Sequence, residues 1–221
     1  MSKELTIVLV SGGMDSCVVT SIADTEYELA MLHVNYGQLT EKRELKAFND
    51  IADYYKVNKN RRLVADISYL TKIGGSSLTD KQIEIDSPTN DNGVVPNTYV
   101  PFRNTHFLSI AVSWAEVIAA KTIFIGAVAQ DRPGYPDCTQ PYYNAFNKLI
   151  TVGTKPSTQI KVLTPIIGMQ KSEIVKKGFS LNAPLDLTWS CYKNSETACG
   201  KCNSCVLRLE AFRKAGIDDF V

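Results

Sequence analysis

A run of apolar residues followed at once by a glycine-rich turn constrains the fold more than any other feature of this chain. Residues 5–10 read LTIVLV, which is typical of a strand buried on both faces of a parallel sheet. Residues 11–16 read SGGMDS, and a helix is expected to begin there, with Asp15 and Ser16 as candidate N-cap residues. A strand, a tight turn and a helix N-terminus in that order present unpaired backbone N–H groups. The junction therefore predicts an anion site, most often for phosphate.

The rest of the chain repeats this alternation between strand and helix patterns. Apolar runs predict further strands, and apolar residues at helical spacing predict the helices between them. The expected strands are 29–34, 61–65, 122–125 and 160–163, and the expected helices are 41–55, 103–118, 142–150, 171–177 and 206–216. This order predicts an α/β fold with right-handed βαβ units in a doubly wound parallel sheet. Because ligands bind at the carboxyl ends of such strands, the loops after Val10 and Val34 should line one site.

Length and charge narrow the class of protein. A chain of 221 residues accommodates one α/β domain and a small appendage, and its composition shifts only near Asp186, which suggests domains at 1–185 and 186–221. The formal net charge of +1 argues against a broad nucleic-acid surface and favours a small-molecule ligand. No stretch approaches the ~18 apolar residues of a membrane span and no export signal is visible, so we expect a cytoplasmic protein without a membrane partner.

One long segment, 66–100, loses the alternation. Its composition is that of loops, with GGSS at 74–77 and SPTNDNG at 87–93. Segments of this kind inside a compact domain serve as lids, binding loops or oligomer contacts, and surface disorder is the other interpretation.

Four of the six cysteines gather in the tail, at Cys191, Cys199, Cys202 and Cys205. Two overlapping CxxC units allow backbone turns to aim several sulfurs at one point. Four thiolates at this density favour one closed, tetrahedral, structural zinc site per chain, which leaves no coordination position for a substrate. An iron–sulfur cluster is the main rival, because soft thiolates suit both metals.

Some single residues attract attention on chemical grounds. Lys171 is expected in the first turn of a helix, where a cation opposes the helix dipole unless an anion lies there; a solvated lysine is the alternative. His33 falls within a strand and is expected in the core or at the sheet edge. Cys17 is expected to be a packing residue, whereas Cys138 lies in a polar loop that could face a substrate.

The loop and a set of further motifs carry a resemblance. SGGMDS resembles the SGGxDS loop of the ATP pyrophosphatase (PP-loop) superfamily, whose members cleave ATP between the α- and β-phosphates, and the fold this implies is an adenine nucleotide alpha hydrolase-like sheet. In order along the chain, the motifs are SGGMDS at 11–16, HVNYGQ at 33–38, VPFRN at 100–104, GYPDC at 134–138, TWSCY at 188–192 and CGKCNSC at 199–205. Together they resemble the 7-cyano-7-deazaguanine (preQ0) synthase family of queuosine biosynthesis over essentially the whole chain.

The resemblance implies a C–N ligase that consumes ATP. The family converts 7-carboxy-7-deazaguanine and ammonia into a nitrile through an adenylated carboxylate and then an adenylated amide. It further implies Mg²⁺ to neutralise charge on the departing pyrophosphate, and it suggests a homodimer. The alternative is a related adenylating ligase that uses another amine or stops at the amide. An RNA-modifying PP-loop enzyme is a third possibility, against which the near-neutral charge argues.

The resemblance also assigns roles residue by residue. Catalytic roles fall to Asp15, Arg103 and Lys171, the two cations offsetting charge on the phosphates or on the substrate carboxylate. The residues expected to contact ATP are Val10, Ser11, Gly12, Gly13, Met14, Asp15, Ser16, His33, Val34 and Asn35. The residues expected to contact the deazapurine are Arg103, Asn104, Asp131, Tyr135 and Asp137. Tyr135 would stack on the ring, and the two aspartates would accept from its N–H groups, although Asp137 could instead form an Asx turn.

The chain departs from the family pattern beside GYPDC. Thr139 follows this motif where the family commonly has arginine, and Arg132 and Pro133 precede it where a small polar or aromatic residue is usual. Both departures fall where the carboxylate-bearing substrate should bind.

Overall fold

Five parallel strands form one sheet in the computed structural model, which describes residues 3–80, 82–85, 95–129 and 135–220. The strands are β1 (Leu5–Leu9), β2 (Glu28–Asn35), β3 (Arg62–Asp66), β4 (Thr122–Ile125) and β5 (Lys161–Leu163). Their order is β3-β2-β1-β4-β5, and every neighbouring pair is parallel. The chain therefore moves one way from β1 and later returns to the other side, so the strand order reverses between β1 and β4. The predicted doubly wound α/β fold is confirmed.

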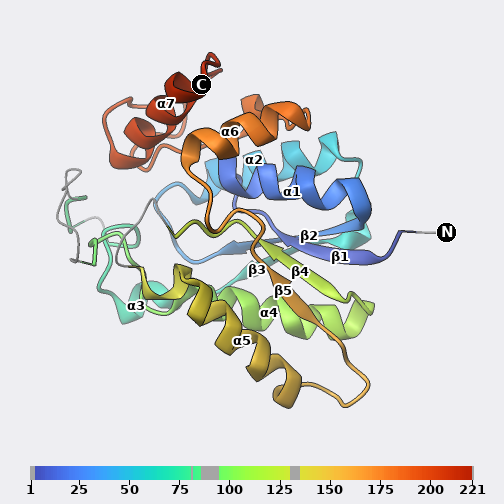
Figure 1. Ribbon diagram of the computed structural model, residues 1–221. Coiled ribbons are helices and arrows are strands. Elements are labelled where there is room, and N and C mark those ends of the chain that lie inside the picture. Colours follow the sequence, from blue (N-terminus) through green and yellow to red (C-terminus); the bar gives the residue numbers. More distant parts are fainter. Residues whose placement is uncertain (1–2, 81, 86–94, 130–134, 221) are drawn as a thin grey trace.

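Helices cover both faces of this sheet (Figure 1). One face carries α1, α2 and α6, and the opposite face carries α4 and α5, with the short α3 nearby. The helices are α1 (Met14–Glu26), α2 (Glu41–Tyr54), α3 (Leu70–Ile73), α4 (Arg103–Ile118), α5 (Gln140–Gly153), α6 (Lys171–Ser180) and α7 (Asn203–Ala215). Among the described residues none of these helices combines the length and the apolar character needed to cross a membrane.

The apolar run that opens the sequence is the centre of both cores. Ile7 and Leu9 pack with α4 and α5, while Val8 and Val10 face the helices of the other side. Because side chains alternate across a strand, only a continuous apolar run can serve two covered faces. This explains why β1 occupies the middle of the sheet.

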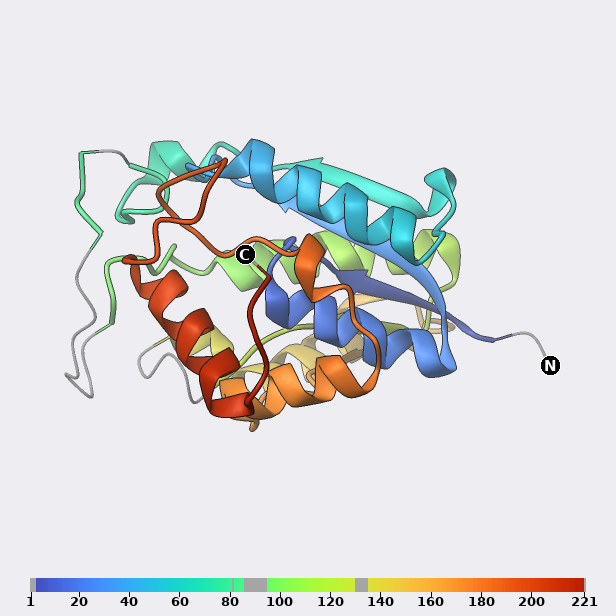
Figure 2. The ribbon, with the colours of Figure 1, turned by 90° about the horizontal axis from the view of Figure 1, so that it is seen from above.

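The tail returns to the carboxyl-end edge of the sheet, where α7 lies beside α6 in both views (Figure 2). Ala211 and Phe212 of α7 are buried in the same cluster as Val8 and Val10. Arg208 is almost fully buried, and its guanidinium donates to both carboxylate oxygens of Asp219 at 2.8–3.0 Å. The tail helix is thus part of the main core through its apolar side, and it ends at Gly216 as expected.

Some local expectations need correction. α5 begins at Gln140, before the expected start, because Thr139 is its N-cap and the Thr139 hydroxyl accepts from the Tyr142 backbone N–H at 3.3 Å. The departure from the family pattern at this position is therefore a helix cap. Segment 66–100 contains the short helix α3, and its residues 81 and 86–94 lie outside the described residues, as do Arg132 and Pro133.

Candidate functional site

A cavity of about 250 Å³ lies at the carboxyl ends of the strands, next to the β1–β4 reversal. Loops after β1, β2 and β4 line it, together with the first turn of α4, the start of α6 and part of the tail. From the expected nucleotide residues it includes Val10, Ser11, Gly13, Met14, Asp15, Ser16, His33 and Val34. From the expected substrate residues it includes Arg103, Asn104 and Tyr135. Elements far apart in the sequence therefore converge as the loop argument predicted.

The SGG turn is held by its own side chains. The Ser11 hydroxyl accepts from the Gly13 backbone N–H at 3.2 Å and lies 3.2 Å from the Ser16 hydroxyl. Ser16 donates to the Gly13 carbonyl at 2.9 Å. The prediction that Asp15 or Ser16 caps α1 was wrong: Gly13 occupies the N-cap, without a side-chain cap, and both residues lie in the first turn. The helix N-terminus therefore opens toward the cavity, as an anion site requires.

Gly12 cannot carry a side chain in this turn. Its φ is +87°, and a Cβ built there would lie 2.6 Å from the Glu44 backbone oxygen of α2. Replacing Gly12 by alanine should weaken ATP binding at least about tenfold, because the left-handed backbone costs ~1–2 kcal/mol and the turn must also move away from α2. Titration calorimetry with ATP measures this. Gly153→Ala is the matched control, since a Cβ there meets nothing within 4 Å; ATP binding by Gly12→Ala equal to that of wild type would contradict the prediction.

Asp15 and Lys171 form an ion pair at the mouth of the loop. The Lys171 Nζ donates to Asp15 Oδ2 at 2.5 Å, and both side chains are mostly buried. The cation that opposes the α6 dipole is thus matched by an anion from the chain itself. Asp15 Oδ1 is buried and accepts no hydrogen bond from the described part of the chain. A buried carboxylate oxygen in this state is suited to a cation or to a donor on a ligand.

His33 joins the ends of β1 and β2. It is buried, its Nδ1 lies 2.8 Å from the Val10 carbonyl oxygen and its Nε2 lies 3.0 Å from the Asn35 side-chain oxygen. The expectation of a core histidine is confirmed. Asn35 is not among the described residues that line the cavity, and it contacts the lining residue His33 through its side-chain oxygen.

Arg103 enters the cavity from the first turn of α4. Its Nη1 donates to the Tyr36 hydroxyl at 3.1 Å, and its guanidinium carbon lies 5.0 Å from the centre of the Tyr36 ring and 5.5 Å from that of Phe107. Neither aromatic partner was predicted from the sequence. The signal was present in the HVNYGQ motif, which places Tyr36 directly after β2.

Asp137 is hydrogen-bonded to the first turn of α4. Its carboxylate accepts from the Asn104 backbone N–H at 3.1 Å, and the Asn104 amide donates to the Asp137 carbonyl at 2.9 Å. Burial raises the pKa of Asp137, against the opposing effect of the Asn104 N–H. Tyr135 is buried in the cavity wall with its hydroxyl 2.5 Å from that of Thr98. The substrate roles of these residues stay predictions, and Asp131 lies outside the described residues.

Two cysteines outside the tail differ in environment. Cys17 is fully buried in the α1 side of the core, where burial raises the pKa of its thiol to about 12. It is therefore an unreactive packing residue, as expected. Cys138 lines the cavity and accepts from the Asn104 side-chain amide at 3.4 Å.

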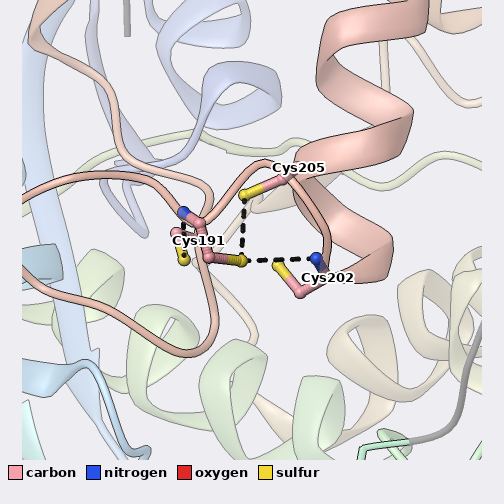
Figure 3. A group of neighbouring side chains, drawn as sticks. Cys191, Cys202 and Cys205 are labelled. Carbon is pink, nitrogen blue, oxygen red and sulfur yellow. Dashed lines mark hydrogen bonds between the residues drawn. The ribbon is translucent and has the colours of Figure 1, made fainter.

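The tail cysteines form one cluster. The Sγ atoms of Cys191, Cys199, Cys202 and Cys205 all lie within 4.8 Å of one another. Figure 3 shows Cys191, Cys202 and Cys205 gathered between the tail loop and α7. Backbone N–H groups of Lys193, Asn194 and Cys199 point at the Cys191 sulfur at 3.3–3.4 Å. A tetrahedral zinc site with Zn–S near 2.3 Å requires sulfurs about 3.8 Å apart, and Cys199 and Cys205 are 3.9 Å apart. The four residues fit a metal.

The tail also contacts the SGGMDS loop directly. The Trp189 backbone N–H donates to the Gly12 carbonyl at 2.9 Å, and the Arg43 guanidinium lies over the Trp189 ring at 4.3 Å. Trp189, Ser190 and Tyr192 line the cavity next to Cys191. This contact was not predicted, because nothing local in the sequence connects position 189 with position 12.

Comparisons with known proteins agree over nearly the whole chain. The family profile for queuosine biosynthesis protein QueC matches residues 5–216. The chain is 56% identical over 214 residues to the 7-cyano-7-deazaguanine synthase of Chlorobium phaeobacteroides, covering 96% of this chain and 94% of that protein. It is 54% identical, with the same coverage, to the 7-cyano-7-deazaguanine synthase of Chloroherpeton thalassium.

Solved structures share the fold at low identity. The U34-tRNA thiolase NcsA of Methanococcus maripaludis, with its [4Fe-4S] cluster, superposes with a TM-score of 0.52 at 14% identity, over 96% of this chain and 64% of that one. A predicted subunit of tRNA methyltransferase from Methanocaldococcus jannaschii gives a TM-score of 0.51 at 12% identity, over 97% and 89%.

Proposed function

The chain belongs to the QueC family of queuosine biosynthesis proteins, and from this premise we propose how it forms 7-cyano-7-deazaguanine. Its substrates are 7-carboxy-7-deazaguanine, ammonia and ATP. The observation that carries the proposal is that one cavity is lined by residues of the SGGMDS loop, by the Asp15–Lys171 pair and by Arg103. An anion cradle, a matched ion pair and a guanidinium in one cavity suit the activation of a carboxylate by a nucleotide.

The loop is the proposed site of the ATP phosphates. The turn from Ser11 to Gly13 and the open N-terminus of α1 offer backbone N–H groups to the pyrophosphate that departs. The main chain around His33 and Val34 borders the adenosine at the end of β2. Lys171 lies where it can offset negative charge on the phosphates, and its pairing with Asp15 keeps it oriented.

Asp15 is the proposed holder of Mg²⁺. Its buried Oδ1 is the kind of hard oxygen ligand that Mg²⁺ prefers, and it has no other partner in the described chain. When bound with ATP, the ion neutralises charge on the phosphates.

The chemistry proceeds through two activations. The substrate carboxylate attacks the α-phosphorus of ATP, pyrophosphate leaves, and ammonia displaces AMP from the resulting acyl-adenylate to give an amide. The amide oxygen then attacks the α-phosphorus of a second ATP, pyrophosphate leaves, and loss of AMP and of both protons of the amide nitrogen gives the nitrile. Donors that stabilise departing pyrophosphate serve both steps, so one loop suffices for both activations.

The cysteine cluster is the proposed site of one structural zinc per chain. Four thiolates close its coordination, so it takes no part in the reaction. We also propose that residues 186–221 act as a metal-stapled appendage of the 1–185 domain, since Trp189 and Arg208 connect the tail to the loop and the core. The homodimer, the cytoplasmic location and the lack of a nucleic-acid partner stay predictions.

The test is product analysis with ammonia as the only amine. The purified protein, ATP, Mg²⁺ and 7-carboxy-7-deazaguanine should release AMP and pyrophosphate and yield a product with the mass of the nitrile. AMP release with accumulation of the amide alone would instead identify an adenylating ligase that stops early. No AMP release would reject the proposed chemistry.

A further inference from the structure

Arg208 of α7 is a buried cation whose N–H groups are all bonded within the protein. Its Nε and Nη2 donate to the Asp219 carboxylate at 2.8–3.0 Å, and Nη2 also donates to the Leu185 carbonyl at 3.2 Å. Its Nη1 donates to the Thr188 hydroxyl at 2.7 Å and to the Ser190 hydroxyl at 3.4 Å. These bonds use every N–H group of a guanidinium, so Arg208, although it lines the cavity, acts on it through its protein partners.

The two hydroxyls that Arg208 binds flank Trp189, the residue that contacts the SGGMDS loop. The Trp189 backbone N–H donates to the Gly12 carbonyl at 2.9 Å. Thr188 is fully buried, so its bond from Arg208 is shielded from water. One nitrogen of the guanidinium, Nη1, therefore fixes the chain on both sides of the residue that holds the loop.

The charges of Arg208 and Asp219 are both nearly hidden from water, since their side chains are only 5% and 7% exposed. Taking two charges out of water costs free energy that apolar side chains of similar size would not cost. The best-attested use of such a buried charge is to specify one arrangement of the chain among several. Here the carboxylate fixes the direction of the guanidinium, and Nη1 then meets residues 188 and 190.

We propose that Arg208 is a positioning residue for the nucleotide: with Asp219 as its counter-ion, it holds Trp189 against Gly12 and thereby sets the affinity of the SGGMDS loop for ATP. The inference rests on the proposed function in taking that loop as the phosphate site. Backbone N–H groups bind phosphate best when their directions are fixed before binding, so a looser support at Gly12 weakens ATP binding. The deazapurine acid is not proposed to bind this loop, and its affinity should not depend on Arg208.

The test is the KM for each substrate in variants at positions 208 and 188. Arg208→Lys keeps the charge but cannot bond to Asp219, Thr188 and Ser190 together. Thr188→Val removes the hydroxyl and keeps the ion pair, whereas Thr188→Ser keeps a hydroxyl. In assays of AMP release, the KM for ATP should rise about fivefold to tenfold in Arg208→Lys and Thr188→Val and stay near that of wild type in Thr188→Ser. The KM for the acid should not change in any of them.

Arg62→Lys is the matched control. Arg62 donates to the Asp53 carboxylate at 2.6 Å and to the carbonyls of Ala52 and Val57, and its side chain is 14% exposed. It lies at the amino end of β3 and outside the described cavity lining, so this variant should keep the wild-type KM for ATP.

A purely structural defect gives a different result. Partial unfolding lowers the apparent kcat and leaves the KM of the folded molecules unchanged. Metal content, measured on each variant, reports whether the tail is folded. If Arg208→Lys does not fold, Thr188→Val and Thr188→Ser, which leave the ion pair intact, decide the question.

Two outcomes would overturn the inference. One is an unchanged KM for ATP in Thr188→Val at full metal content, and the other is an equal rise of both KM values, which would indicate a general distortion of the cavity. Calorimetric titration with ATP separates this inference from the proposed function. A wild-type protein that binds ATP but releases no AMP would reject the function, while the ATP affinities of the variants would still decide the role of Arg208.

Discussion

Replacing Asp15 by asparagine is expected to lower the rate of AMP formation by about 10²–10³-fold at saturating ATP and Mg²⁺. Asparagine keeps the shape of the side chain and removes its charge. Lys171 would then lose its counter-charge in a mostly buried position, and the side chain would keep one neutral oxygen in place of the two carboxylate oxygens that can face Lys171 and a cation together. Single-turnover AMP release, with ATP affinity measured separately, distinguishes a chemical defect from weak binding.

A surface ion pair provides the comparison for this variant. Lys46 and Asp50 are also 2.5 Å apart, but they lie one helical turn apart on α2 with the lysine largely exposed. Asp50→Asn should change stability by no more than about 0.5 kcal/mol and leave AMP formation intact. Full turnover by a folded Asp15→Asn protein would remove Asp15 from the catalytic residues.

Removing the metal is expected to have the largest effect on the tail. Structural zinc contributes on the order of 10 kcal/mol to small coreless segments, so a chelator or Cys202→Ser should unfold the region around residues 188–205. Because the Trp189 N–H bonds to the Gly12 carbonyl, ATP affinity should fall together with metal content. Elemental analysis should give about one zinc per chain before treatment, as expected for four thiolate ligands.

One control variant and two possible outcomes decide how the metal experiment is interpreted. Cys138→Ser removes a cysteine outside the cluster and should retain the full metal content. Iron with a visible absorbance band in place of zinc would favour the iron–sulfur interpretation of the four cysteines. A metal-free chain that binds ATP as tightly as the loaded one would show that the Trp189 contact does not support the loop.

The sequence predicted the parts of the fold that depend on local pattern. The apolar run at β1 and its alternation onto two cores followed directly from residue type. The bounds of β4 match the expectation, and those of the other four strands differ from it by one residue at one or both ends. The open helix N-terminus after SGG was also predictable. Its cap was not, because glycine takes the N-cap while Ser11 and Ser16 bond to the turn. The statistical preference for Asp and Ser as N-cap residues is therefore overridden here by the geometry of the loop, which puts glycine at the N-cap.

Most of the described residues that were expected in the site line the cavity, whereas the contacts among them were not predicted. Asp15 and Lys171 were both expected to be catalytic, yet their pairing across 156 positions has no local signature. The same holds for Tyr36 and Arg103, which meet only because β2 and α4 converge at one edge of the sheet. Asp137 has a contact that its motif did not indicate, since its carboxylate accepts from the backbone N–H of Asn104 at the start of α4, while its substrate role stays a prediction. Long-range partners are decided by topology, which residue spacing does not encode.

The hydrogen bond from the Trp189 N–H to the Gly12 carbonyl can form only after most of the chain has been synthesised on the ribosome. The loop containing Gly12 leaves the exit tunnel early, whereas its partner is translated 177 positions later (189 − 12). At synthesis rates of about 5–20 residues per second, the nascent chain carries an unfinished loop for on the order of ten seconds or more. During this interval the Gly12 carbonyl lacks its hydrogen bond from the Trp189 N–H, so the loop reaches its final set of contacts only after the tail has folded back onto it.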